Sequence, residues 1–168
     1  MVRRVYWDAC CFLGLLNPSE DKHADCLSVW KEAADKKAII LTSYWSFAEV
    51  FKAKCEGPAK PLDEAGDKKV EDLLRQRWIE PILVDERVGT LARRLMRAYP
   101  ECKKPTDAVH LASALIVDPD EMHTYDGCDL LHLSGKILTT GSRMLEICPP
   151  RPAPPPPPPP APLLEHGG

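Results

Sequence analysis

Short β-prone runs alternate with helical patterns along most of this chain, and this alternation constrains the fold more than any other feature. The candidate strands cover residues 2–7, 38–41, 81–84, 121–125 and, more weakly, 144–148. The helical patterns cover residues 9–16, 20–36, 44–55, 62–78, 86–98 and 106–117. This order is typical of an α/β fold in which helices cover a parallel sheet.

Two of the expected helices are amphipathic. In residues 86–98, apolar side chains recur at helical spacing and arginines occupy another face, which predicts a helix with one buried stripe. In residues 106–117, the stripe is formed by Ala108, Leu111, Ala112 and Leu115. Its alanines would let this helix approach the sheet closely.

The composition changes abruptly at Cys148, because 11 of the 18 prolines follow it. A chain of 168 residues can bury one core. We therefore expect a folded domain over residues 1–148 and a proline-rich tail over 149–168. The tail lacks amide donors and predicts an extended polyproline II segment, either a passive spacer or a ligand for an aromatic groove of a partner.

The net charge and the cysteine pattern restrict the binding partners and the cellular compartment that we expect for the protein. The formal net charge of −3 gives no global attraction to nucleic acid, so any such contact needs a local basic patch. The seven cysteines form no C-x-x-C pair, which favours reduced thiols over a zinc site. The sequence shows neither a signal peptide nor an apolar run long enough to span a membrane, and we expect a cytoplasmic protein.

Four acids stand where they could meet. Asp8 ends the first expected strand, Glu49 lies in the helix after the second, Asp107 opens the last helix, and Asp126 follows the strand at 121–125. In an open parallel sheet, ligands bind beyond the carboxyl ends of the strands. These acids could therefore gather on that edge.

Each acid also has an ordinary structural role open to it. Asp8 could be an N-cap, Glu49 the acid of a capping box with Ser46, Asp107 a first-turn acid on the helix dipole, and Asp126 a turn residue. Convergence would decide between the two interpretations. Carboxylates packed together repel unless they are protonated or share a cation, and oxygen-only ligands suit Mg²⁺ or Mn²⁺.

Four segments carry a resemblance to a known family. In order, "VYWDACCFLGLL", "LTSYWSFAEVFK", "KPTDAVHLASALI" and "HTYDGCDL" resemble the acidic motifs of the PIN-domain nucleases, closest to the VapC-like toxins of toxin–antitoxin pairs. The likeness covers about residues 2–148. It implies a three-layer α/β/α sandwich with a central, mostly parallel sheet.

The resemblance also implies a Mg²⁺- or Mn²⁺-dependent endoribonuclease. Carried over by motif, the metal-coordinating acids would be Asp8, Glu49, Asp107 and Asp126, and Thr124 would match the hydroxyl that helps to arrange the site. Asp129 could replace or assist Asp126. The family often dimerises and often pairs with an antitoxin protein, so both partners are expectations alongside the RNA substrate.

Basic residues near the acids are candidates for contacts to RNA phosphates, although a solvated helix face is an equal alternative. The candidates are Arg87, Arg93, Arg94, Arg97, Lys103 and Lys104. His110 is expected to be a partly buried helix residue and not a catalytic base. A rival function is a non-catalytic PIN-like binding module that recruits a partner through the proline-rich tail.

Overall fold

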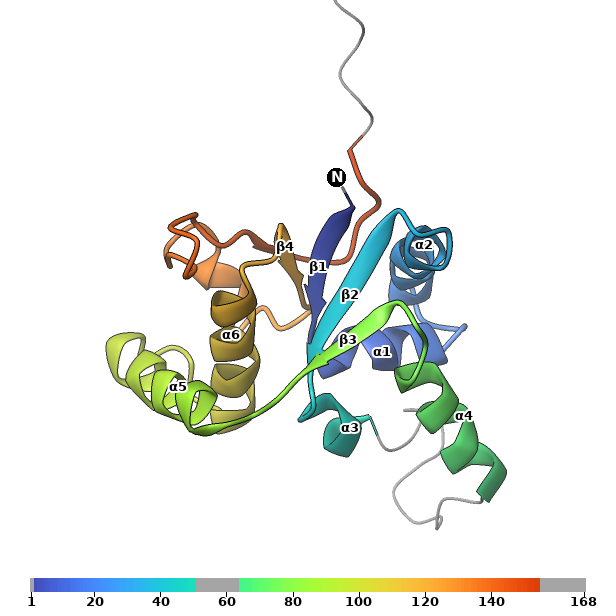
Figure 1. Cartoon of the computed structure of the whole chain (residues 1–168), viewed down its shortest axis with the longest axis horizontal. Helices are drawn as coiled ribbons and strands as arrows, with labels where there is room; N and C mark the ends of the chain where they lie inside the picture. The colour runs from blue at the N-terminus through green and yellow to red at the C-terminus, as the bar shows by residue number, and fades with distance from the viewer. Residues whose placement is uncertain (1, 51–63, 155–168) are drawn as a thin grey trace, which may run out of the picture.

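The computed structural model describes residues 2–50 and 64–154 and contains a five-stranded sheet in the order β3-β2-β1-β4-β5 (Figure 1). Every neighbouring pair of strands is parallel, as the alternation of strands and helices predicts. The strands are β1 (Arg3–Trp7), β2 (Ala38–Ser43), β3 (Ile79–Ile82), β4 (Glu121–His123) and β5 (Ile147–Cys148).

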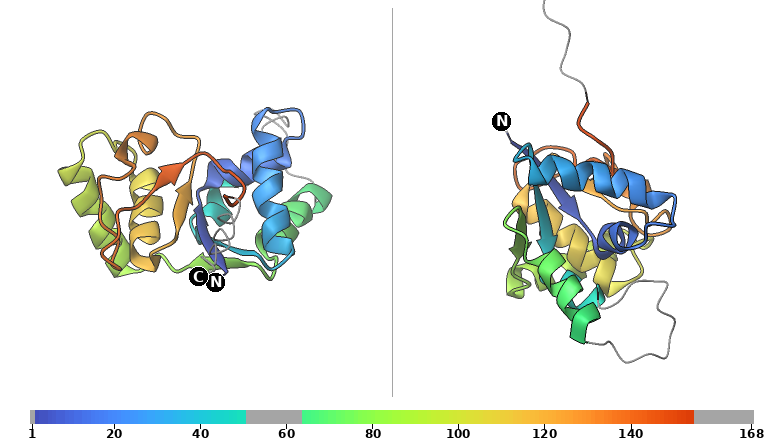
Figure 2. Two further views of the ribbon diagram at one scale, coloured as in Figure 1. Left: turned by 90° about the horizontal axis from the view of Figure 1, so that it is seen from above. Right: turned by 90° about the vertical axis from the view of Figure 1, so that its right-hand side faces the viewer.

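Helices cover both faces of this sheet. They are α1 (Ala9–Leu16), α2 (Lys22–Ala34), α3 (Ser46–Glu49), α4 (Glu64–Leu74), α5 (Glu86–Ala98) and α6 (Pro105–Val117), with a 3₁₀ turn η2 (Leu131–Leu133). Figures 1 and 2 show α5 and α6 on one side of the sheet and α1, α2 and α4 on the other. The three-layer α/β/α sandwich is therefore confirmed.

Two hydrophobic cores fill the space between the layers, and β1 supplies both through the two-residue alternation of a strand. Val5 and Trp7 point into the core beneath α1, α2 and α4. Tyr6 points into the core beneath α5 and α6. All three side chains are fully buried, as a central strand covered on both faces requires.

Helix α6 has more buried residues than any other helix in the described part of the chain, and its two ends are well defined. Pro105 occupies the first turn, where its missing amide donor is no loss. Asp118 ends the helix in a left-handed conformation and accepts hydrogen bonds from Thr139 and Arg143. A Cβ atom at Gly141 would lie 2.0 Å from Asp118 Oδ2, so a side chain at this position would require the Asp118 carboxylate to move.

Some expected boundaries were wrong. The helix predicted over 44–55 begins at Ser46 and ends at Glu49, because Val50 already leaves helical geometry; residues 51–55 lie outside the described part. The expected capping box is also wrong, since Ser46 Oγ bonds to Thr42 Oγ1 at 2.7 Å. Strand β3 covers 79–82 instead of 81–84, and its proline is tolerated because β3 lies at a sheet edge.

The chain beyond Cys148 stays in contact with the sheet for several residues. Arg151 forms ion pairs with Glu121 and Glu146, and the amide of Ala153 donates to Glu32 Oε1 at 2.8 Å. The expected tail over 149–168 thus begins with an anchored segment, and residues 155–168 of that prediction lie outside the described part. Across residues 2–50 and 64–154, no helix has the length and apolar character needed to span a bilayer.

Candidate active site

The four acids that the sequence analysis singled out line one cavity of about 460 Å³. It lies at the carboxyl edge of the sheet, where β1 and β2 lead into α1 and α3 and where α6 begins. The lining residues are Asp8, Ala9, Cys10, Leu13, Ala48, Glu49, Asp107, His110 and Asp126. Residues from four separate segments of the chain therefore share one hollow.

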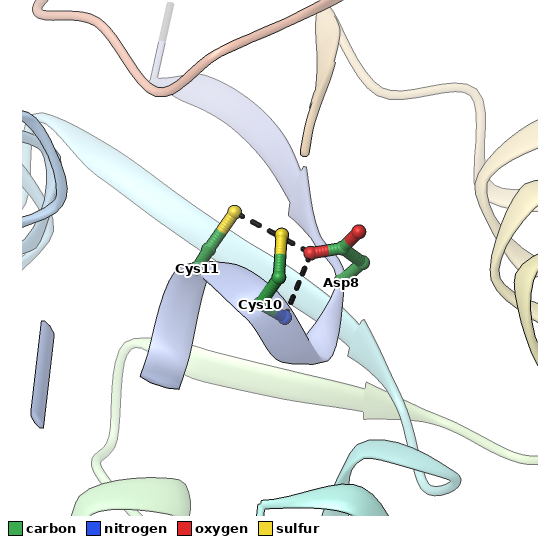
Figure 3. Close-up of side chains that lie close together, drawn as sticks. All are labelled: Asp8, Cys10 and Cys11. Carbon is green, nitrogen blue, oxygen red and sulfur yellow. Dashed lines mark hydrogen bonds between the residues drawn. The ribbon is translucent and has the colours of Figure 1, made fainter. Parts of the chain in front are cut away.

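Asp8 is both a helix cap and a wall of the cavity. Its Oδ1 accepts from the backbone amide of Cys10 at 3.0 Å and starts α1, with the thiol of Cys11 3.6 Å away (Figure 3). Its Oδ2 accepts from Thr124 Oγ1 at 2.5 Å. The capping role expected for this residue is real, and it occupies only one of the two oxygens.

Thr124 follows β4 and connects two of the acids. The fully buried hydroxyl donates to Asp8 and accepts from the backbone amide of Asp126 at 2.9 Å. A single hydroxyl thereby fixes the spacing between the end of β1 and the loop after β4. This is an arranging contact of the kind that the resemblance implies for Thr124.

Three aspartates form the tightest acidic group of the described residues, in the sense that theirs is the one group of three carboxylates there whose oxygens all lie within 4.8 Å. Oxygen atoms of Asp107, Asp126 and Asp129 lie within 4.8 Å of one another. Asp126 Oδ1 accepts from the amides of Cys128 and Asp129 at 2.9 and 2.8 Å, which is the expected turn. Asp129 does not line the cavity that the other acids share, so of the two Asp126 has the better placement for the fourth acid.

Glu49 is held by a histidine that the sequence analysis had placed in a merely structural role. His110 Nε2 lies 2.7 Å from Glu49 Oε2, and Nδ1 lies 3.0 Å from the hydroxyl of Tyr6. An ionised Glu49 can only accept, so Nε2 donates, and in the neutral ring Nδ1 accepts from Tyr6. Burial raises the pKa of Tyr6 and keeps that hydroxyl protonated. This chain of contacts orients Glu49 toward the cavity.

The charges of the group are unequally compensated. Burial raises the pKa of Asp107 to about 6, and the nearby Asp129 and Asp126 add to the rise against the opposing effect of Lys104. For Asp126, burial alone would raise the pKa, yet the amide of Asp129 and the ammonium of Lys104 bring it below its ordinary value. Of Asp107, Asp126 and Asp129, only Asp107 therefore has a pKa above its ordinary value.

These residues suit a divalent cation. Carboxylate oxygens are the ligands that Mg²⁺ and Mn²⁺ prefer, and Mg²⁺ needs only one or two of them together with waters and substrate oxygens. The cavity offers four carboxylates and room for waters. Burial, and then the neighbouring acids, raise the pKa of Asp107, so a cation beside it would favour its ionised form.

Comparison with known proteins decides the family. The PIN domain profile matches residues 5–127, which is most of the folded part and contains all four acids. The chain belongs to the PIN domain family. The fold is similar to that of the VapC20 toxin of Mycobacterium tuberculosis, described as a sarcin–ricin loop cleaving toxin, with a TM-score of 0.58 and 16% identity over 73% of this chain and 90% of that one. Comparison with curated protein sequences found no match.

The predicted phosphate-binding residues of this PIN domain lie in different places. Arg87 and Arg94 line another cavity of about 540 Å³ with Ile116 and Thr140, beside the end of α6 opposite to Asp107. Arg93, Arg97 and Lys103 are exposed and form no ion pair among the described residues. Only Lys104 reaches the acids.

Sequence reasoning missed two side chains of this PIN domain cavity. His110 was assigned no role toward the acids, although its position three residues after Asp107 puts both on one face of α6. Cys10 follows Asp8 and lines the cavity, with its sulfur 3.7 Å from Thr124 Oγ1. The position of Cys10 two residues after Asp8 could have indicated this. The first helical turn after an acid at the end of a strand lies at the same carboxyl edge of the sheet as that acid.

Proposed function

We propose that this PIN domain is a Mg²⁺- or Mn²⁺-dependent endoribonuclease in which Asp8, Glu49, Asp107 and Asp126 hold the cation. The observation that carries the proposal is the convergence of these four carboxylates on one cavity. Helix capping and turn formation each need one acid at one place, and neither requires the acids to share a hollow.

A divalent cation bound there would supply water that ionises near neutral pH and positive charge opposite the scissile phosphate. The chain itself has to place the ligands. Asp8 is fixed by its amide and hydroxyl contacts, Asp126 by its turn, and Glu49 by His110. No side-chain nucleophile is required by this reaction class, and the two thiols near Asp8 take no part in it.

Several features support RNA as the substrate. The fold is similar to that of a toxin described as cleaving the sarcin–ricin loop, and the sequence motifs resemble those of VapC-like ribonucleases. Exposed arginines on α5 and Lys103 offer positive charge for phosphate contacts, although Arg87 and Arg94 would meet RNA outside the cavity. An antitoxin partner, a homodimer and a cytoplasmic location belong to the same proposal.

The decisive experiment compares two isosteric substitutions that both replace a helix-capping aspartate. Asp8 caps α1 inside the cavity, whereas Asp85 caps α5 outside it by accepting from the amide of Val88 at 3.0 Å. Asparagine caps helices as well as aspartate does, so both variants should fold. Asp8→Asn should lower Mn²⁺-dependent cleavage of a labelled RNA by about 100-fold or more, because a charged cation ligand is lost.

Asp85→Asn should cleave at the rate of the parent protein, and Asp107→Asn should lose activity like Asp8→Asn. Cleavage that persists in both cavity variants, or that proceeds equally well in a chelator, contradicts the proposal. Absence of cleavage by the parent protein on every RNA tested would favour the rival function, a binding module acting through its tail.

A further inference from the structure

Lys104 stands apart from the other basic residues because its ammonium group faces three carboxylates at once. The Nζ atom lies 3.3 Å from Asp107 Oδ2, 3.1 Å from Asp126 Oδ2 and 3.0 Å from Asp129 Oδ2. The neighbouring Lys103 is exposed and has no such partner among the described residues. One positive charge therefore sits at the centre of the tightest acidic group.

Lys104 faces the carboxylate oxygens of Asp107 and Asp126 that, within the described part of the chain, make no hydrogen bond to a backbone amide or a hydroxyl. Asp126 Oδ1 is committed to two backbone amides, which leaves Oδ2 as its available ligand atom, and Lys104 contacts that atom. Asp107 Oδ1 is 3.5 Å from the hydroxyl of Thr106, and its Oδ2 again faces Lys104. A cation entering this group needs the oxygens that the ammonium already holds.

We propose that Lys104 is a tethered counterion of the cation site: its ammonium, which Asp129 also contacts, competes with a divalent cation for the carboxylates of Asp107 and Asp126. The inference rests on the proposed metal site and adds a residue that sets its affinity. Lys104 is then a positioning residue, which offsets the negative charge of the three acids before the cation arrives and moves away when it binds.

The position of Lys104 allows such an exchange. Its side chain is 58% exposed, whereas those of Asp107 and Asp129 are 16% and 6% exposed. The acids are thus held in place by their surroundings, and the lysine reaches them from solvent on a flexible stem. Displacing it costs partly exposed ion pairs, which are weak individually, and returns the ammonium to water.

The test measures Mn²⁺ binding by calorimetry and by thermal melting, without reference to catalysis. Lys104→Met keeps the length of the side chain and removes the charge, Lys104→Arg keeps the charge, and Lys103→Met is the matched control. Lys104→Met should bind Mn²⁺ at least about fivefold more tightly than the parent protein, because no internal cation has to be displaced.

Melting should move in step with binding. Without a divalent cation, Lys104→Met should melt below the parent protein, since three close carboxylates lose their counterion, and the rise in melting temperature on adding Mn²⁺ should be larger. Lys104→Arg should restore the parent affinity, and Lys103→Met should match the parent in both measurements. If Lys104 mattered only through the packing of its stem, Lys104→Met, which keeps a stem of similar length, would match the parent protein in both measurements.

The outcomes separate this inference from the proposed function. If the parent protein binds Mn²⁺ and Lys104→Met binds it equally or more weakly, the counterion role is wrong while the nuclease proposal stands. If neither protein binds Mn²⁺, both are wrong. If Asp8→Asn abolishes cleavage and the Lys104 variants behave as expected, both hold.

Discussion

The two ends of β4 carry two clusters of charged residues that are compensated in opposite ways. At the start of β4, the carboxylate of Glu121 lies 2.7 Å from Arg3, 2.9 Å from Arg151 and 2.9 Å from His123. After it, the loop places Asp126 among other carboxylates with Lys104 as the one ammonium within ion-pair distance in the described part of the chain. We call these the paired cluster and the cavity cluster.

The difference shows which cluster could bind a cation. In the paired cluster, His123 is fully committed, because Nδ1 accepts from Trp7 Nε1 at 3.1 Å and Nε2 therefore donates to Glu121. Cys148 lies close enough to Glu121 and His123 to form a possible metal-ligand group with them. The carboxylate of Glu121 is, however, already neutralised by Arg3 and Arg151. The cavity cluster keeps a deficit of positive charge. Judged by their potential ligand residues alone, the two clusters are equally good candidates for a cation site. The basic residues that pair with their carboxylates distinguish them.

The largest effect should follow from breaking the paired cluster. Glu121→Gln leaves Arg3 and Arg151 without their shared carboxylate, and it should lower the free energy of unfolding by about 3 kcal/mol, since both Arg3 and Glu121 are largely buried. Urea denaturation would measure it. Glu146→Gln is the control: its carboxylate pairs with Arg151 at the surface, and its loss should cost less than about 1 kcal/mol. Equal effects would contradict the distinction.

Acid should weaken the paired cluster in two steps. Burial lowers the pKa of His123 below 6.5, against the opposing effect of Glu121. For Glu121, burial would raise the pKa, but His123, Arg151 and Arg3 together hold it well below 4.5. Both groups bind fewer protons in the folded chain than in the unfolded one. The stability they contribute is therefore present above pH 6.5 and is lost as the pH falls through 6.5 and then 4.5.

We expect the free energy of unfolding of the parent protein to fall as the pH drops below 6.5 and to fall further below 4.5. Unfolding measured from neutral pH to acid in the parent protein and in Glu121→Gln would test it, because the variant lacks this carboxylate and should show a shallower decline below pH 4.5. A decline of the same slope in both proteins would assign the acid sensitivity to other carboxylates.

Local periodicity predicted the parallel sheet, its covering helices and most helix bounds, and the family resemblance implied the three layers. The sequence could not distinguish the two charged clusters. Glu121 lies at the start of a recognised strand, yet its partners Arg3 and Arg151 come from the two ends of the folded chain. The orientation of Lys104 was out of reach for the same reason, since a lysine before a helix gives no sign that three acids surround it. Contacts between distant residues follow from topology, and a single sequence shows only local pattern.

The smallest effect should be a gain of stability in the cavity cluster. The pKa of Asp107 is raised to about 6, above its ordinary 3.8, so the folded chain disfavours the ionised carboxylate, and the resulting penalty is complete above pH 6. Asp107→Asn removes that penalty and should raise the free energy of unfolding of the metal-free protein at pH 8 by about 1 kcal/mol, a value reduced for partial exposure to solvent. Asp85→Asn, at an exposed helix cap, should leave it unchanged.

Added Mg²⁺ should reverse this order. The parent protein gains stability from a cation that binds only the folded state, and Asp107→Asn, with one charged ligand fewer, should gain less. Thermal melts of both proteins with and without Mg²⁺ would show the crossing. If Asp107→Asn is less stable than the parent without a cation, then Lys104 already compensates the acids in full, and the cavity cluster is a second paired cluster instead of a place for a metal ion.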